Sequence, residues 1–303
     1  MNVLVTGGAG LIGMALRDTL AARGHAVTAI DITDFGRADP GLAIVGFDDR
    51  PAIEDLIAAN RVDAIIHCGA ISGPMMARDQ PLLLVDVNIV ATALLLDLAR
   101  THAMRRFVFC SSISVYGNVG AAPISEDTPL RPTSVYGATK VACEQLIQGF
   151  AAEYGVEGVS LRISRVYGPY RRANCHLGAI IRNAAAGTQT EIPCDPMFKY
   201  HYIHVDDVAE ALVAALEAPV LPARSYNAGS GEALTMPEIA AIARQAIPDS
   251  VIRLLPGADD VPDVQTAFDV SLIDRDLGWR PRLMLAEGLE AYRRAIVSGR
   301  ASH

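Results

Sequence analysis

The 303-residue sequence has few cysteines, a single tryptophan and no block of basic residues. Its five cysteines are scattered, and no two of them form a CxxC motif, which excludes a disulfide-built scaffold and favours a reducing, cytoplasmic location. Lys and Arg number 26 against 34 Asp and Glu, so the formal net charge is −8. This balance makes nucleic acid and anionic membranes poor candidates as partners.

No apolar run extends over the length of a membrane span without interruption. The most apolar stretch, residues 81–99, contains Asp86, Asn88 and Asp97, which argues against a spanning helix. A strand-like run begins at Asn2, so we expect no signal peptide. Apolar residues are nevertheless plentiful: 51% of the sequence is hydrophobic and 20% is charged, which is enough for a large core in one or two domains.

Short apolar runs alternate with helical patterns through the first half of the chain. Runs rich in Val, Ile and Phe predict buried strands at 2–5, 26–30, 64–67, 107–110 and 159–163. Helical periodicity covers 11–22, 52–59, 82–100 and 135–154. This alternation predicts an α/β fold, a Rossmann-type doubly wound parallel sheet with right-handed crossovers.

The pattern changes after about residue 168. Helices are predicted at 177–186, 205–217, 237–246 and 285–297, with few strands between them. We therefore expect residues 1–165, with about 200–230, to form the sheet domain. Residues 166–199 and 231–303 are expected to form a smaller C-terminal domain.

Three glycines follow the first predicted strand. Gly7, Gly10 and Gly13 form a GxxGxxG motif between a strand and a helix, where missing side chains let phosphate groups approach the backbone N–H groups of a helix N-terminus. Asp31 ends the second predicted strand, where a carboxylate accepts hydrogen bonds from adenosine ribose hydroxyls and repels a 2′-phosphate. The glycines alone are also typical of a tight turn, but with Asp31 they predict NAD as the cofactor.

A second motif consists of Ser112, Tyr136 and Lys140. Tyr136 and Lys140 lie four residues apart on one face of a predicted helix, and Ser112 follows the fourth predicted strand at the carboxyl edge of the sheet. A phenol is a weak base at neutral pH, and a nearby ammonium favours its phenolate form. A serine hydroxyl orients the substrate oxygen and stabilises developing charge on it. YxxxK alone usually marks a solvated helix face, but beside the glycine motif it predicts oxidation of an alcohol.

With these motifs the sequence resembles the extended short-chain dehydrogenase/reductase family, in its branch of NAD-dependent sugar epimerases and dehydratases. The matching segments span nearly the whole chain: TGGAGLIG (6–13), HCGA (67–70), DVNIVAT (86–92), SSISVYG (111–117), YGATK (136–140), RISRVYGP (162–169), YIHVDDVAEAL (202–212), YNAGSG (226–231) and DLGWRP (276–281). The resemblance implies a Rossmann domain that holds NAD, a smaller substrate-binding domain, and Ser112, Tyr136 and Lys140 as catalytic residues.

The resemblance also implies which residues contact NAD and how the chain assembles. Besides Tyr136 and Lys140, the implied NAD contacts are Gly7, Gly10, Leu11, Ile12, Gly13, Asp31, Ile32, Asp48, Cys68, Gly69, Ala70, Asn88, Cys110 and Ile163. Family members often dimerise through two helices, here 82–100 and 135–154, so we expect a homodimer. The other expected partner is a small carbohydrate-like substrate.

Departures from the family pattern narrow the expected reaction. Dehydratases carry adjacent Asp and Glu after the catalytic hydroxyl, whereas this chain has Ile113 and Ser114, which cannot act as acid or base. Nucleotide-sugar enzymes place one Arg where Tyr200 stands and a second Arg in the region 254–262, where Leu255 is the matching position. Each lost charge-assisted contact weakens a diphosphate site by about 1.5–3 kcal/mol.

The candidate substrate contacts are Ser72, Ser112, Arg165 and His176. Arg165 stands where the family has an Asn that holds substrate, and it fits a sugar carboxylate as well as it fits an arginine that bridges two domains. His176 opens a predicted helix and fits either a substrate contact or a surface or capping residue. Ser72 fits either a substrate contact or a turn.

One cluster, His201, His204, Asp206 and Asp207, has residue types that bind metals. The two histidines lie three apart on a predicted strand, so their side chains point to opposite faces. The two aspartates stand where a helix begins and are expected to cap it. We therefore expect no metal site.

These observations lead to one principal hypothesis and two alternatives. The principal hypothesis is an NAD-dependent oxidoreductase that acts on a secondary alcohol of a free sugar, sugar acid or polyol, because the phosphate-binding positions are altered. The first alternative is a nucleotide-sugar 4-epimerase of the UDP-hexose type, in which NAD is reduced transiently. The second is a catalytically silent NAD-binding module, which is disfavoured because both the tyrosine and the lysine are present.

Overall fold

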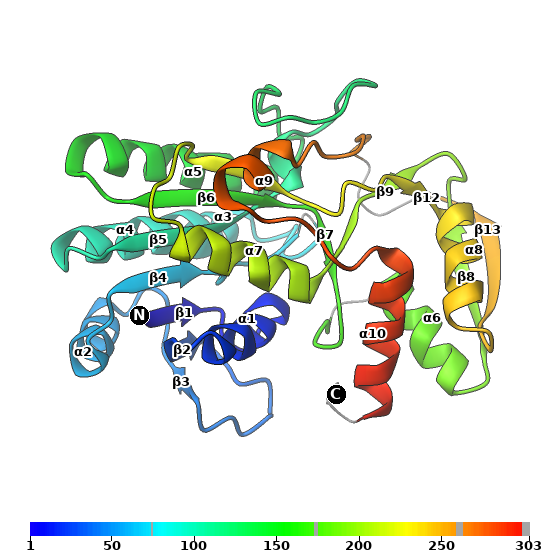
Figure 1. The fold of residues 1–303 in the computed structure, drawn as a ribbon, viewed down its shortest axis with the longest axis horizontal. Helices are drawn as coiled ribbons and strands as arrows, with labels where there is room; N and C mark the ends of the chain where they lie inside the picture. The colour runs from blue at the N-terminus through cyan, green and yellow to red at the C-terminus, as the bar shows by residue number, and fades with distance from the viewer. Residues whose placement is uncertain (74, 173–174, 259–262, 299–303) are drawn as a thin grey trace.

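A seven-stranded, fully parallel sheet forms the larger part of the molecule (Figure 1). The computed structural model describes residues 1–303 except 74, 173–174, 259–262 and 299–303. The strand order is β11-β6-β5-β4-β1-β2-β3. Their bounds are β1 (Asn2–Thr6), β2 (Ala26–Asp31), β3 (Leu42–Ile44), β4 (Ala64–His67), β5 (Arg106–Ser112), β6 (Gly158–Ile163) and β11 (Ser225–Ala228). This order confirms the predicted doubly wound α/β fold, with its switch point between β1 and β4.

Helices cover both faces of the sheet, which is why its central strands are apolar throughout. In β1, Val3 and Val5 face the core beneath α1 (Leu11–Ala22) and α7 (Val205–Glu217). Leu4 faces the opposite core, as the two-residue period of a strand requires. That core lies beneath α2 (Arg50–Asn60), α4 (Ala91–Thr101) and α5 (Val135–Tyr154).

The smaller domain lies beyond the carboxyl ends of the strands, at the right of Figure 1. Its core gathers residues such as Ile180, Ile239 and Leu289 from three helices around a two-stranded sheet. These elements are α6 (His176–Ala185), β8 (Gln189–Cys194), α8 (Met236–Ala246), β13 (Val251–Pro256) and α10 (Leu285–Val297). Two further strand pairs join the domains, β7 (Arg165–Tyr167) with β10 (Tyr202–His204) and β9 (Lys199–Tyr200) with β12 (Leu234–Thr235). The prediction of few strands in this half was wrong. β7, β9, β10 and β12 have only two or three residues, too few to leave a pattern, and the six-residue β8 and β13 also went unpredicted.

One segment of the C-terminal region packs on the sheet rather than in the smaller domain. The helix α9 (Ser271–Leu277) places Ile273 in the core beneath α7, and Trp279 joins it there. The Tyr226 hydroxyl, from β11, donates a hydrogen bond to Asp276 over 3.2 Å. This packing differs from the predicted division, which placed all of 231–303 in the smaller domain.

The predicted helix at 82–100 is a continuous helical stretch with a wide turn in its middle. The turn Asp86–Val90 is π-helical and joins α3 (Pro81–Val85) to α4. Within it, the carbonyl oxygen of Asn88 accepts hydrogen bonds from the Thr92 hydroxyl at 2.6 Å and from the Cys143 thiol at 3.1 Å. These side chains satisfy a carbonyl whose ordinary helical bond is displaced.

Within the described residues, the stretch Pro81–Thr101 is long and apolar enough to cross a membrane by length and composition. Of its most apolar window, 44% is buried inside the fold. A core helix passes the same test, so the absence of a membrane partner stays a prediction.

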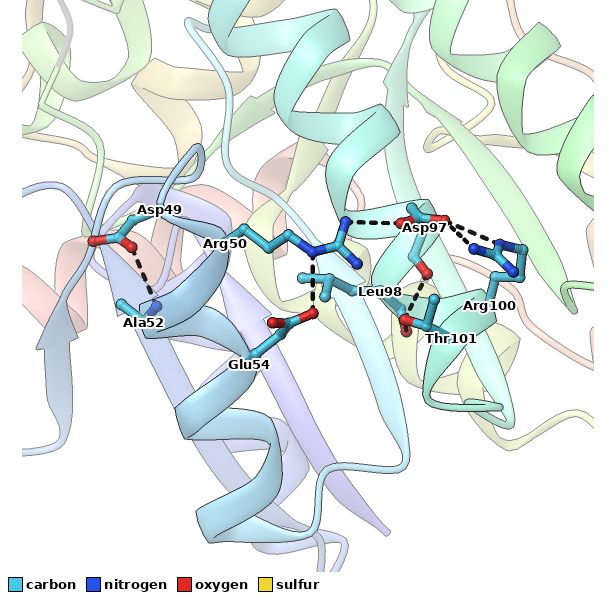
Figure 2. Close-up of polar contacts among 8 residues, drawn as sticks. All are labelled: Asp49, Arg50, Ala52, Glu54, Asp97, Leu98, Arg100 and Thr101. Atoms are coloured by element: carbon cyan, nitrogen blue, oxygen red, sulfur yellow. Dashed lines mark hydrogen bonds and ion pairs between the residues drawn. The ribbon is translucent and has the colours of Figure 1, made fainter.

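Polar contacts tie the start of α2 to α4 (Figure 2). Asp49 caps α2, and Arg50 donates hydrogen bonds to Glu54 at 3.0 Å and to Asp97 of α4 at 2.7 Å. The hydrogen bond from Arg50 helps to hold the pKa of the Asp97 carboxyl below its usual range. Because these side chains are partly exposed, such a pair orients the helices more than it stabilises them.

Candidate active site

A cleft of about 1200 Å³ opens at the carboxyl ends of β1, β2, β4, β5 and β6, where the smaller domain meets the sheet. It brings together every predicted cofactor, catalytic and substrate residue except Asn88. The residues brought together are Gly7, Gly10, Leu11, Ile12, Gly13, Asp31, Ile32, Asp48, Cys68, Gly69, Ala70, Ser72, Cys110, Ser112, Tyr136, Lys140, Ile163, Arg165 and His176.

The glycine turn leaves no room for side chains. Gly7 has φ +69°, and a Cβ on it would stand 2.7 Å from the backbone nitrogen of Gly69. A Cβ on Gly13 would stand 2.1 Å from the Gly7 carbonyl oxygen. Helix α1 begins at Leu11 with no side-chain cap, so its first N–H groups point to the cleft without helical partners. This cradle fits the pyrophosphate of NAD.

Asp31 lies at the end of β2 with its carboxylate held in place by the backbone. Its Oδ2 accepts from the N–H of Ala9 at 3.1 Å, and its Oδ1 accepts from the N–H of Ile32 at 2.8 Å. Burial raises the pKa of Asp31, and these N–H groups offset part of that rise. The fixed carboxylate at the strand end is placed as a ribose-binding acid requires.

Tyr136 and Lys140 come from the first two turns of α5. Ser134 caps this helix by accepting a hydrogen bond from the N–H of Gly137 at 3.1 Å, which fixes where its first turn starts. The Lys140 Nζ donates to the Cys110 carbonyl at 2.8 Å and lies 5.8 Å from the centre of the Tyr136 ring. The buried ammonium therefore stands beside the phenol, on the cleft floor.

Ser112 is the last residue of β5 and is 8% exposed. Its Oγ accepts a hydrogen bond from the N–H of Ser114 at 3.2 Å, in a short 3-10 turn (Ile113–Val115). Ile113 and Ser114 also line the cleft. The two positions next to the Ser112 hydroxyl thus face the cleft without an ionisable group.

A buried polar network, which the sequence analysis did not predict, supports this end of β5. Ser111 donates to Glu144 of α5 at 2.5 Å, and Arg162 of β6 donates to the same carboxylate with its closest contact at 2.8 Å. Arg162 also donates to the Tyr116 hydroxyl at 2.8 Å, which in turn donates to Asn227 at 2.7 Å. Burial raises the pKa of Tyr116 to about 12. The sequence signal for this network was one charged residue in each of two buried elements, Glu144 in α5 and Arg162 in β6.

Asn88 is buried and does not line the cleft; it supports the residues that do. Its side-chain oxygen accepts from the N–H of Ile71 at 2.9 Å, and its amide donates to the Thr139 hydroxyl at 3.0 Å. It thereby fixes the loop after β4 against α5. The predicted direct NAD contact of Asn88 is not what this geometry provides, because its polar atoms are already engaged by the protein.

The substrate end of the cleft contains an arginine over two aromatic rings. The Arg165 guanidinium lies 5.2 Å from the ring centre of Tyr200 and 5.8 Å from that of Tyr202. These two rings are stacked, with 5.9 Å between centres. His176, the first residue of α6, meets the Tyr200 ring edge-on at 6.2 Å. Ser72 is exposed at the edge of the cleft.

The second predicted phosphate-binding position is Leu255, in the segment 254–262. Leu255 lies in β13 opposite Pro193, away from the cleft lining. Residues 259–262 of the loop 254–262 lie outside the described residues.

Three of the four residues considered as a metal cluster, His204, Asp206 and Asp207, belong to the start of α7, whereas His201 lines the cleft. His204, rather than the aspartates, is its N-cap and accepts from the N–H of Asp206 at 3.2 Å. Asp207 accepts from the N–H groups of Arg282 at 3.0 Å and Leu283 at 2.9 Å, which ties the C-terminal chain to this helix. Among the described residues, no three His, Cys, Asp or Glu side chains group closely enough to hold a metal ion.

Comparison with known proteins identifies the family of the chain. The model of the NAD dependent epimerase/dehydratase family matches residues 3–229. The chain belongs to this family. A curated relative, the UDP-glucose 4-epimerase of Mycolicibacterium smegmatis, is 32% identical over 95% of this chain and 96% of its own length.

Two solved structures resemble this chain along nearly its full length. The UDP-glucose 4-epimerase of Thermotoga maritima, crystallised with UDP-glucose, is 26% identical with a TM-score of 0.88, over 98% of this chain and 99% of that one. The UDP-glucose 4-epimerase of Thermus thermophilus, in complex with NAD, is 28% identical with a TM-score of 0.85, over 97% of this chain and 98% of that one. The predicted family, its enzymatic nature and its use of NAD are thereby confirmed.

Proposed function

We propose that this protein is a nucleotide-sugar 4-epimerase, with Ser112, Tyr136 and Lys140 as its catalytic residues. The observation that carries the proposal is the complete trio in one cleft beside the glycine turn, with Ile113 and Ser114 where a dehydratase would need an acid and a base. The resemblance to UDP-glucose 4-epimerases along the whole chain supports the same reaction class.

The three residues divide the proton chemistry among them. Tyr136 takes the proton of the sugar C4 hydroxyl and later returns it, while the Lys140 ammonium stabilises the intervening phenolate. Ser112 donates a hydrogen bond to the same sugar oxygen when it becomes a carbonyl. NAD, when bound along the glycine turn and Asp31, supplies the reversible hydride acceptor that the reaction needs. Inversion then requires the keto sugar to present its other face.

Cationic side chains at the substrate end fit an anionic substrate. Arg165, Arg171, Arg182 and Lys199 all line the cleft. They offer a diphosphate several positive partners although Tyr200 replaces the arginine expected there. We propose that Arg165, held over the two tyrosine rings, contacts an anionic group of the substrate.

The oxidoreductase of free sugars, which the sequence favoured first, has less support. It rested on two altered phosphate positions, and the cleft supplies other cations near one of them. The relatives that match over nine-tenths of the chain include nucleotide-sugar epimerases. Net oxidation of a free sugar acid therefore becomes the competing outcome of the test.

The test is to incubate the purified protein, without added NAD, with UDP-glucose, UDP-N-acetylglucosamine and UDP-glucuronic acid separately. Proton NMR should show the C4 epimer of at least one of them at equilibrium. Tyr136→Phe should abolish the conversion, whereas Tyr154→Phe, at the exposed end of the same helix, should retain it. In a parallel incubation with added NAD, stoichiometric NADH formation from a free sugar or sugar acid, with no UDP-sugar converted, would refute the proposal.

A further inference from the structure

Two thiols lie against each other on the floor of the cleft. Cys68 follows β4, Cys110 lies in β5, and the Cys110 thiol donates a hydrogen bond to the Cys68 sulfur across 3.4 Å. Both residues line the cleft. We propose that Cys68 and Cys110 are a modification site, which a peroxide converts to a reversible disulfide and which thereby controls NAD binding.

The backbone already has the geometry that this bond needs. β4 and β5 are parallel neighbours in which His67 pairs with Phe109, so Cys68 and Cys110 are the next pair along. Neighbouring strands lie about 4.8 Å apart, and disulfides join Cα atoms separated by about 4.4–6.8 Å. The sulfur atoms must close from 3.4 Å to about 2.05 Å, a change that side-chain rotation can supply.

The oxidation balances with one molecule of hydrogen peroxide. The deprotonated sulfur of one cysteine attacks a peroxide oxygen, forming an S–O bond and breaking the O–O bond, and the departing hydroxide leaves as water after taking a proton. The second thiol then gives up its proton and attacks the resulting sulfenic sulfur. The S–S bond forms, the S–O bond breaks and a second water leaves. Two thiols are oxidised, one peroxide is reduced to two waters, and a dithiol reductant reverses the change.

A disulfide at this position would act on both Lys140 and the glycine turn. The Cys110 carbonyl holds the Lys140 ammonium at 2.8 Å, so movement of Cys110 moves the anchor of a catalytic residue. Gly69, next to Cys68, lies against Gly7 of the glycine turn. Both cysteines lie among the cleft residues that would hold NAD, so bound cofactor would shield the sulfur atoms from peroxide, and a disulfide there would weaken cofactor binding.

The surroundings of the reduced pair set its reactivity. The hydrogen bond shared with Cys110 and burial raise the pKa of the Cys68 thiol well above its usual range, against the opposite effect of the Lys140 charge. The reduced pair is therefore slow to oxidise at neutral pH and reacts faster as pH rises. It responds to sustained oxidant rather than to brief exposure.

The experiment maps thiols in the folded, full-length protein after treatment with hydrogen peroxide. We expect a linked peptide pair containing Cys68 and Cys110, lighter by about 2 Da than the two thiol peptides and lost on addition of dithiothreitol. Saturating NAD should slow its formation by roughly tenfold, and NAD affinity of the oxidised protein should fall by roughly tenfold until reduction. Both cysteines remaining as thiols, separate sulfinic acids, or a link that forms only in denaturant would overturn the proposal.

Two variants separate this site from the other cysteines. Cys68→Ser should lose the dithiothreitol-reversible loss of NAD affinity. Cys194→Ser, a substitution in β8 of the smaller domain, should retain it. Because peptide mass and NAD affinity are the readouts, the result does not depend on which sugar nucleotide the enzyme accepts. If Cys68→Ser fails to fold, the peptide map of the unsubstituted protein still decides the question.

Discussion

Replacement of Glu144 by glutamine should expose how much the buried network contributes to stability. Glu144 is fully buried, and Arg162 is 5% exposed. Arg162 donates to the carboxylate at 2.8 Å and, through Nε, at 3.1 Å to each oxygen. Glu144→Gln keeps the side-chain volume but leaves the guanidinium without its counter-charge. Loss of one partner of a buried pair costs about 3–5 kcal/mol.

The matched control is Glu157→Gln, which breaks an ion pair with Arg224 at the surface. Those side chains are 48% and 34% exposed, so the control should change the free energy of unfolding by about 0–1 kcal/mol. Urea denaturation followed by circular dichroism measures both variants. At about 2 °C per kcal/mol, Glu144→Gln should also lower the Tm by about 6–10 °C. Equal destabilisation of the two variants would refute the reasoning.

Three further predictions concern the cofactor turn, pH and substrate binding. Gly7→Ala places a methyl group against the neighbouring loop at a φ of +69° and should weaken NAD binding by at least roughly tenfold in calorimetric titration, whereas Gly149→Ala, with open space around it, should not. Burial lowers the pKa of His67 to about 3 and of His201 to about 4, from 6.5. The unfolded chain therefore binds protons that the folded chain does not, and Tm should fall as pH decreases from 6.5 towards 4; a flat profile contradicts this. Arg165→Gln should raise the KM for the nucleotide sugar by roughly 10- to 150-fold with a smaller change in kcat, and an unchanged KM removes Arg165 from the substrate site.

The larger elements of the fold could be predicted because local patterns determine them. The helix predicted at 135–154 is observed as Val135–Tyr154, and the strand predicted at 64–67 as Ala64–His67. Long helices carry a periodic signal, and fully buried strands appear as short continuous apolar runs. The glycine turn and the catalytic trio were visible for a related reason, since each combines unusual residue types with a required place at the sheet edge.

The rest depends on partners that are distant in sequence. Strands of two or three residues, such as β9 (Lys199–Tyr200), exist only because another strand lies beside them. The cap of α7 is His204 rather than Asp206 because the chain enters this helix from β10. The contact between Cys68 and Cys110 follows from the register of two strands, and nothing in the spacing of these cysteines indicates it.

The π-helical turn at Asp86–Val90 lets this helical stretch tolerate a change in length. Leu83, before the turn, and Val87, within it, line the cleft, whereas Leu95 and Leu98, after the turn, are buried in the core beneath α4. A π turn holds one residue more than an α turn while the flanking turns keep their phase. One residue can therefore be gained or lost in this turn during evolution while α4, which packs beneath the sheet, keeps its register.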